Sequence, residues 1–156
     1  MNTKRRIVTL GIVGMAIGLT AIGIQSRVQA VPFDLLKLDG SFWVRATWDT
    51  QSAQALATFS YGGGVVETPN VAFGLSNGHG AWESLGNRNF AIKVIYFRWD
   101  DVGNPIGTTE VQSWVRLTPN GDFFNGRFRT FVKDMDDNLE DSFDGTAWGT
   151  RIEFDD

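Results

Sequence analysis

The chain has 156 residues and a formal net charge of −4, from 14 Lys and Arg against 18 Asp and Glu. It has no cysteine, which excludes a disulfide framework and a lipid-modified N-terminal cysteine. The single histidine, His79, is too little for a zinc or copper site built from His and Cys. The acidic balance also disfavours nucleic-acid binding, because it repels phosphate backbones.

The first thirty residues have the layout of a secretory signal peptide. The basic run Lys4-Arg5-Arg6 precedes an apolar stretch from Ile7 to Ile24, and Val28-Gln29-Ala30 follows as a cleavage site. We expect cleavage after Ala30, which leaves 31–156 as one β-barrel domain that is secreted or periplasmic. Loss of 1–30 removes four basic residues and no acidic ones, so the formal charge becomes −8.

An uncleaved membrane anchor is the alternative, since the apolar stretch approaches the length of a membrane span. Gly11, Gly14, Gly18 and Gly23 dilute this stretch and favour cleavage, after which we expect no stable membrane insertion. The pair Arg5-Arg6 leaves both the general and the twin-arginine export routes open.

From Gly40 onward the sequence predicts an all-β domain. Short stretches rich in Val, Ile, Thr and aromatic residues alternate with Gly, Asn, Asp and Pro clusters. Only Pro32 to Leu38 could form a short helical turn. The expected strands are Phe42 to Trp48, Ala55 to Tyr61, Gly64 to Thr68, Ala81 to Leu85, Asn89 to Trp99, Thr108 to Leu117, Phe123 to Lys133 and Gly145 to Phe154.

The clearest hairpin signal is Asn120-Gly121, which predicts a type I′ turn. A two-residue loop there places Leu117 opposite Phe124 and Trp114 opposite Arg127, so that apolar and charged residues lie on different faces. A slip of one residue would mix the two sets. Trp114 and Arg127 then share a face, where a cation–π contact is expected.

The links Asp100 to Gly107 and Asp134 to Gly145 join the long strands into a meander. About eight consecutive strands with one apolar face and no helix to cover it favour closure into a single antiparallel up-and-down barrel. Closure also removes exposed strand edges.

This architecture resembles the lipocalin-like barrels of the calycin group. Those proteins begin their first strand with Gly-x-Trp and pack a late arginine across the tryptophan. Gly40-Ser41-Phe42-Trp43 has one residue more, and the resemblance implies that Trp43 and Arg151 pair at the closed end. A weaker similarity in outline is to the allene oxide cyclase and dirigent barrels, whose cavities guide a cyclisation or coupling.

An eight-stranded barrel is either filled by side chains or wide enough for one small ligand. The long link from Pro69 to Gly80 is interpreted either as a lid over one mouth or as a self-packed loop. We predict that Phe124 and Phe128, with Trp148 and Ile152 on the last strand, point inward. The predicted ligand-binding residues are Tyr61, Phe73, His79, Trp82, Phe90, Tyr96, Ser113, Phe124, Phe128 and Trp148.

His79 and Glu83 are the two candidates for proton transfer. Four residues along a strand separate their Cα atoms by about 13 Å, which argues against a direct pair. The simplest interpretation of Gly78-His79-Gly80 is a loop that leads into the fourth strand. We expect Trp82 inside the barrel and Glu83 outside, because an unpaired buried carboxylate is unfavourable.

Two acidic segments are interpreted as turns. The cluster from Asp134 to Asp144 lacks the Gly and Glu that an EF-hand loop needs at Leu139 and Gly145, so a solvated hairpin is favoured over a calcium site. Asp100-Asp101 leads into Val102-Gly103-Asn104-Pro105, which is typical of a turn. No metal and no cofactor are expected.

The leading hypothesis is an exported, monomeric or weakly oligomeric barrel that binds a small, largely apolar molecule in its lumen. One alternative is a cavity enzyme that catalyses a cyclisation or isomerisation with His79 or Glu83. Another is a filled barrel that binds a protein partner through Trp114 and Phe131. Whether the protein is an enzyme stays open at this stage, although no motif names a reaction.

Overall fold

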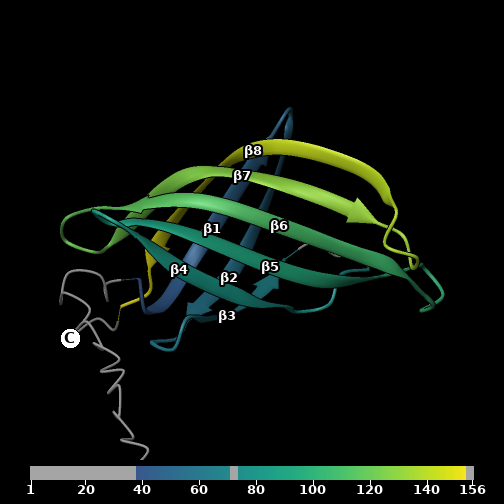
Figure 1. Cartoon of the computed structure of the whole chain (residues 1–156), viewed down its shortest axis with the longest axis horizontal. Helices are drawn as coiled ribbons and strands as arrows, with labels where there is room; N and C mark the ends of the chain where they lie inside the picture. Colours follow the sequence, from purple (N-terminus) through teal and green to yellow (C-terminus); the bar gives the residue numbers. More distant parts are fainter. Residues whose placement is uncertain (1–37, 71–73, 154–156) are drawn as a thin grey trace, which may run out of the picture. The chain divides into compact units, whose positions relative to one another are not determined.

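A computed structural model describes residues 38–70 and 74–153 (Figure 1). Within these residues the elements are strands, paired in chain order with their neighbours, and β1 also pairs with β8 to close the barrel. This confirms the all-β, antiparallel up-and-down barrel. The strands are β1 (Gly40–Trp48), β2 (Gln51–Phe59), β3 (Gly64–Pro69), β4 (Gly78–Gly86), β5 (Asn89–Trp99), β6 (Pro105–Leu117), β7 (Phe123–Lys133) and β8 (Leu139–Arg151).

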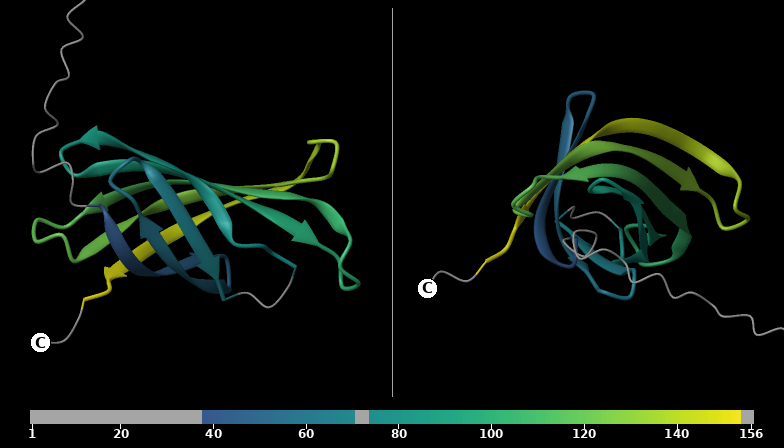
Figure 2. Two further views of the ribbon diagram at one scale, coloured as in Figure 1. Left: turned by 90° about the horizontal axis from the view of Figure 1, so that it is seen from below. Right: turned by 60° about the vertical axis from the view of Figure 1, so that its left-hand side comes forward.

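The strands β5 to β8 are longer than β1 to β4 and extend past them at one end of the barrel (Figures 1 and 2). Alternate residues face the lumen along each strand, as in β5, where four apolar residues of one phase are buried and the residues between them are not. The buried residues of that phase in β5 are Phe90, Ile92, Val94 and Tyr96.

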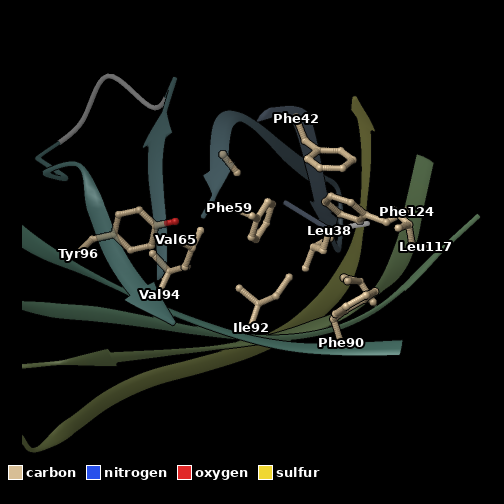
Figure 3. Packing of buried hydrophobic residues seen from close by; sticks show 12 residues of the cluster. Leu38, Phe42, Phe59, Val65, Phe90, Ile92, Val94, Tyr96, Leu117 and Phe124 are labelled. Carbon is tan, nitrogen blue, oxygen red and sulfur yellow. The ribbon is translucent and has the colours of Figure 1, made fainter. Parts of the chain in front are cut away.

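One half of the lumen is filled by side chains, and we call it the packed half. The rings of Phe42 and Phe124 lie 5.2 Å apart, and Phe59 meets both of them edge-on. Leu38 and Leu117 complete this layer, whose side chains are almost fully buried. Figure 3 shows these residues together, with Tyr96 well apart from them.

Arg151 fastens the packed half at its outer end. Its guanidinium lies over the ring of Phe42, with Cζ 4.6 Å from the ring centroid. The same group donates hydrogen bonds to the backbone carbonyl oxygens of Asp39 (2.6 Å) and Gly121 (2.9 Å). The arginine–aromatic contact implied by the lipocalin-like resemblance is therefore present, but with Phe42; Trp43 points outward and is 45% exposed.

The hairpin register between β6 and β7 is confirmed, but the type of turn is not. Leu117 pairs with Phe124 and Trp114 with Arg127, and the Arg127 guanidinium lies 5.6 Å from the Trp114 ring. In this turn Gly121 alone has a positive φ, 87°, and its N–H binds the carbonyl oxygen of Thr118. The turn centres on Pro119-Asn120, because proline fixes the φ angle that its first central position needs.

Several predicted strand boundaries are wrong. The second strand begins at Gln51 rather than Ala55, and β4 includes Gly78 to Gly80, which were expected in a loop. The last strand runs from Leu139 to Arg151, so its acidic first half pairs with β7 instead of forming a link. Turn-like composition misled here, because ladder hydrogen bonds to a long neighbour outweigh weak local preference.

The described residues contain no helix that is both long and apolar enough to cross a membrane. Residues 1–37, 71–73 and 154–156 lie outside the described part, so the predicted cleavage site, the helical turn at Pro32 to Leu38 and the position of Phe73 stay predictions.

We predict that Arg151→Met lowers the free energy of unfolding by about 2 kcal/mol, because two carbonyl groups lose a charged donor. The measurement is urea denaturation followed by tryptophan fluorescence. Arg129→Met is the matched control, since Arg129 pairs with Asp144 on the exposed surface and its loss should matter less. Equal losses in both variants would contradict a structural role for Arg151.

Candidate functional site

The other half of the lumen contains a pocket of about 360 Å³, and we call it the open half. This volume is at the lower end of the range of small-molecule sites. The pocket lies towards the end where β5 to β8 extend beyond the other strands. Its lining residues are Val44, Ala46, Trp48, Ala53, Glu67, Pro69, Leu75, Tyr96, Thr109, Val111, Ser113, Phe128, Thr130, Val132, Phe143 and Ala147.

Small side chains leave the space for this pocket. Ala46 pairs with Ala53 on one side and with Ala147 on the other, so three neighbouring strands present methyl groups to the open half. Phe42 precedes Ala46 on the same face of β1, and its ring fills the packed half instead. The change from phenylalanine to alanine along one face of β1 therefore marks the boundary between the packed half and the open half of the lumen.

An aromatic cluster forms one wall of the pocket. Trp48 stacks on Phe143 with ring centroids 5.3 Å apart, and Phe128 meets both rings nearly edge-on at 6.4 Å. These residues come from β1, β7 and β8. They offer a broad apolar surface of fixed shape, since aromatic pairs of this kind hold each other in place.

Glu67 and Tyr96 form a polar pair on another part of the wall, from β3 and β5. The Tyr96 hydroxyl donates a hydrogen bond to Glu67 Oε1 at 2.6 Å. The Tyr96 ring itself is almost fully buried, while Glu67 keeps some exposure. The pair therefore presents a carboxyl group at the surface of an otherwise apolar cavity.

Burial changes the titration of this pair. Loss of water around the carboxyl raises the pKa of Glu67, and the hydrogen bond from Tyr96 opposes this rise only in part. The pKa of the Tyr96 hydroxyl is well above its ordinary value, first because of burial and then because of the charge and hydrogen bond of Glu67. Tyr96 therefore remains a donor at any moderate pH.

The two glycines beside His79 are explained by close packing. A Cβ atom at Gly78 would lie 2.4 Å from the Tyr96 ring, so glycine leaves the space that this ring fills. A Cβ atom at Gly80 would meet the Lys93 carbonyl oxygen at 1.8 Å. His79 itself is exposed in β4, between Val66 and Ile95 of the neighbouring strands. The sequence Gly78-His79-Gly80 thus belongs to a strand that supports the pocket and is not a loop.

Three of the ten predicted ligand-binding residues line the pocket: Tyr96, Ser113 and Phe128. Phe90 and Phe124 belong to the tightly packed core, where they pack with Trp82 and Phe42 respectively. Trp82 is inside the barrel as expected, and its Nε1 donates to the carbonyl oxygen of Ser60.

Of the remaining predicted residues, Tyr61, His79 and Trp148 do not line the pocket, and Phe73 lies outside the described residues. Tyr61 is 72% exposed in the link between β2 and β3. The prediction that Trp148 and Ile152 point inward is wrong: Trp148 is 39% exposed beneath the Arg45 guanidinium, while its neighbours Ala147 and Gly149 are buried. Bulky apolar residues were assumed to face inward, but in this stretch of β8 the inward residues are Gly145, Ala147 and Gly149, and the rings of Phe128 and Phe124 fill the space beside the two glycines.

Glu83, the other candidate for proton transfer, is exposed on β4 as expected. The link that precedes β4 is described from Gly74 onward. Leu75 lines the pocket and bridges to Arg98, while Ser76 N–H binds the Phe97 carbonyl oxygen at 3.0 Å. The described part of the link thus adds to the edge of β5 and contributes one apolar side chain to the pocket.

The two acidic links fold into turns of the same design. Asp100 accepts backbone hydrogen bonds from Val102 and Asn104, and Asp134 accepts them from Asp136 and Asn138. Side-chain hydrogen bonds from the two asparagines lower the pKa values of both aspartates. Across 38–70 and 74–153, no group of three His, Asp or Glu side chains is arranged to hold a metal ion.

Glu67 is the main site residue that the sequence did not indicate. In the strand Gly64–Pro69, both Val65 and Val66 are apolar, so the pattern did not show which face is inward. Because a carboxylate is unfavourable inside an apolar lumen, Glu67 was not counted among the site residues. The sequence did contain one signal for Glu67. It shares a face of the strand with the apolar Val65, and the strand has no Lys or Arg that could pair with it.

Comparisons of the chain with protein-family models, with curated proteins and with solved structures found no match. The function must therefore be inferred from the pocket itself.

We predict that Glu67→Gln changes the pH dependence of stability. A raised pKa in the folded state means that the folded protein binds the proton more tightly, so the contribution of Glu67 falls as pH rises from its unfolded pKa through its folded pKa. The free energy of unfolding of the parent, relative to Glu67→Gln, should fall across that window. The measurement is urea denaturation at a series of pH values from 4 upward.

Asp144→Asn is the control of opposite sign. The hydrogen bond from Arg129 lowers the pKa of Asp144, so the stability that this carboxylate contributes is lost as pH falls. A parent whose stability relative to Glu67→Gln rises with pH would contradict the buried carboxyl.

Proposed function

We propose that the protein is an exported β-barrel that binds one small, largely apolar molecule in the open half of its lumen. The observation that carries the proposal is the pocket of about 360 Å³, with the aromatic cluster of Trp48, Phe128 and Phe143 on its wall. Export is supported by the layout of 1–30. Burial of apolar ligand surface against these rings would supply most of the affinity.

The proposal includes a lipocalin-like type of barrel. Its support is the division of the lumen into a packed half, fastened by Arg151 on Phe42, and an open half with the pocket. Phe42, Phe59 and Phe124 do not line the pocket, and their packed layer closes the lumen beyond it as a floor. Such a floor would limit the length of the molecule that fits.

A cavity enzyme is the second candidate, and Glu67 favours it. The carboxyl faces the pocket, and burial raises its pKa, which makes it a better proton acceptor than an ordinary glutamate. His79 and Glu83, proposed for this role from sequence, are exposed on β4. Release of a ligand with a changed structure would distinguish this candidate from simple binding.

A filled barrel that binds a protein through Trp114 has less support, because space remains in the open half and Arg127 lies over the Trp114 ring. We therefore place the function in the lumen.

We predict that Ala46→Phe lowers the affinity for the fluorescent probe N-phenyl-1-naphthylamine at least about tenfold, a loss of roughly 1.4 kcal/mol. The added ring would occupy the space between Ala53 and Ala147. Affinity is measured by the rise in probe fluorescence, and the expected stoichiometry is one probe per chain.

Ala81→Phe is the matched control, because it adds the same ring at an exposed position of β4. It should leave the probe affinity within about threefold. A parent protein that takes up no probe, or an Ala46→Phe variant that binds as the parent does, would exclude the open half as the binding site.

A further inference from the structure

The charges around the pocket are unequal. Among its described lining residues Glu67 is the one acid, and none is Lys, Arg or His. Across the neighbouring strands Glu67 lies opposite Ala57 of β2 and Gly78 of β4, neither of which titrates. Tyr96 of β5 is a titratable neighbour of Glu67, and its neutral hydroxyl donates a hydrogen bond to the carboxyl. The protein therefore places a carboxyl in an apolar cavity without a cation to balance it.

Two positive residues that follow the pocket-lining Tyr96 and Val132 on their strands, Arg98 and Lys133, are already paired. Arg98, two residues beyond Tyr96, donates to the Lys133 carbonyl oxygen at 3.0 Å and to Glu140 at 2.5 Å. Lys133 lies 2.9 Å from Asp137. Neither Arg98 nor Lys133 lines the pocket, so neither of them neutralises the charge of the Glu67 carboxylate.

One oxygen atom of the Glu67 carboxyl can still accept a hydrogen bond from a ligand. Tyr96 binds Oε1, and within the described residues no hydrogen bond reaches Oε2. Oε2 is not among the buried atoms that lack a partner, so it is accessible from the pocket, where a proton or a positive donor would stabilise the carboxylate. A protonated amine supplies both the charge and the N–H, and charge-assisted hydrogen bonds of this kind are short and strong.

The rest of the pocket suits the body of such a molecule. Trp48, Phe128 and Phe143 offer an apolar wall, and the faces of aromatic rings also attract organic cations. A ligand with a carboxylate would be repelled by Glu67, while a neutral hydrocarbon would leave Oε2 without a partner. The volume of about 360 Å³ limits the ligand to a small molecule.

We propose that the open half of the lumen selects a small hydrophobic amine, whose protonated nitrogen binds Glu67 and whose apolar body lies against Trp48, Phe128 and Phe143. This inference rests on the proposed function, since it names the chemical class of the ligand of that same pocket. Tyr96 holds the carboxyl in place and leaves one of its oxygens directed to the ligand.

The test compares three probes of nearly equal size by isothermal titration calorimetry at pH 7.5: 1-naphthylmethylamine, 1-naphthylmethanol and 1-naphthoic acid. The amine should bind at least about tenfold more tightly than the alcohol, and the acid more weakly than the alcohol. Glu67→Gln should remove most of the preference for the amine and change the affinity for the alcohol by less than about threefold. Glu83→Gln, which changes an exposed acid of β4, should leave the preference intact.

A second measurement uses the parent protein alone and does not depend on the folding of a variant. The affinity for the amine should fall as pH is lowered and Glu67 takes up a proton, while the affinity for the alcohol should stay constant. Equal binding of amine and alcohol, or a preference for the amine that survives in Glu67→Gln, would overturn the inference and leave the lumen as a binding site. Failure of all three probes to bind would overturn both the inference and the proposed function.

Discussion

Antiparallel pairing between β1 and β8 closes the sheet, from Phe42 opposite Arg151 to Thr47 opposite Thr146. Closure gives every strand two neighbours and removes the free edges that could pair with another chain. It also fixes which face of each strand is inside, because one slip of register would bring the outer residues into the lumen. The packed half, the pocket and the position of Glu67 all depend on this pairing.

Side-chain size then decides how the closed barrel is filled. In the packed half the rings of Phe42, Phe59 and Phe124 meet across the lumen, and Arg151 at the end of β8 lies over the ring of Phe42. In the open half the corresponding positions include Ala46 and Ala53, which cannot reach the opposite wall. In a barrel of eight strands, the size of the inward side chains determines whether the lumen is filled or hollow.

The sequence was sufficient to predict the barrel and much of its register, because these follow from local patterns. Alternation in Asn89 to Trp99 and the sorting of apolar from charged residues around Asn120-Gly121 each involve neighbouring strands only. The extent of the last strand was missed, since its acidic residues resemble a link until they are paired with β7. Pairing of this kind depends on the whole sheet and leaves little trace in the segment itself.

The site was harder to predict than the fold for the same reason. Tyr96, Ser113 and Phe128 could be found because they lie on the apolar face of strongly alternating strands. Trp148 was placed inside by its size, although the neighbouring Gly149 takes the inward position against the Phe124 ring. Which inward residues touch the pocket and which are packed away depends on contacts across the lumen, between strands that are far apart in sequence.

Glu67 illustrates a general conflict between stability and function. Reasoning from stability places a carboxylate outside, and a Gln at this position would keep the hydrogen-bonding shape without the burial of charge. The folded protein instead places the acid, partly buried, beside Tyr96 and gives it no cation among the described lining residues of the pocket. Residues that break a local rule without an evident structural gain are expected at functional sites. The position of Glu67, on the pocket wall beside Tyr96 and without a cation, is thus the feature on which the proposed ligand class depends.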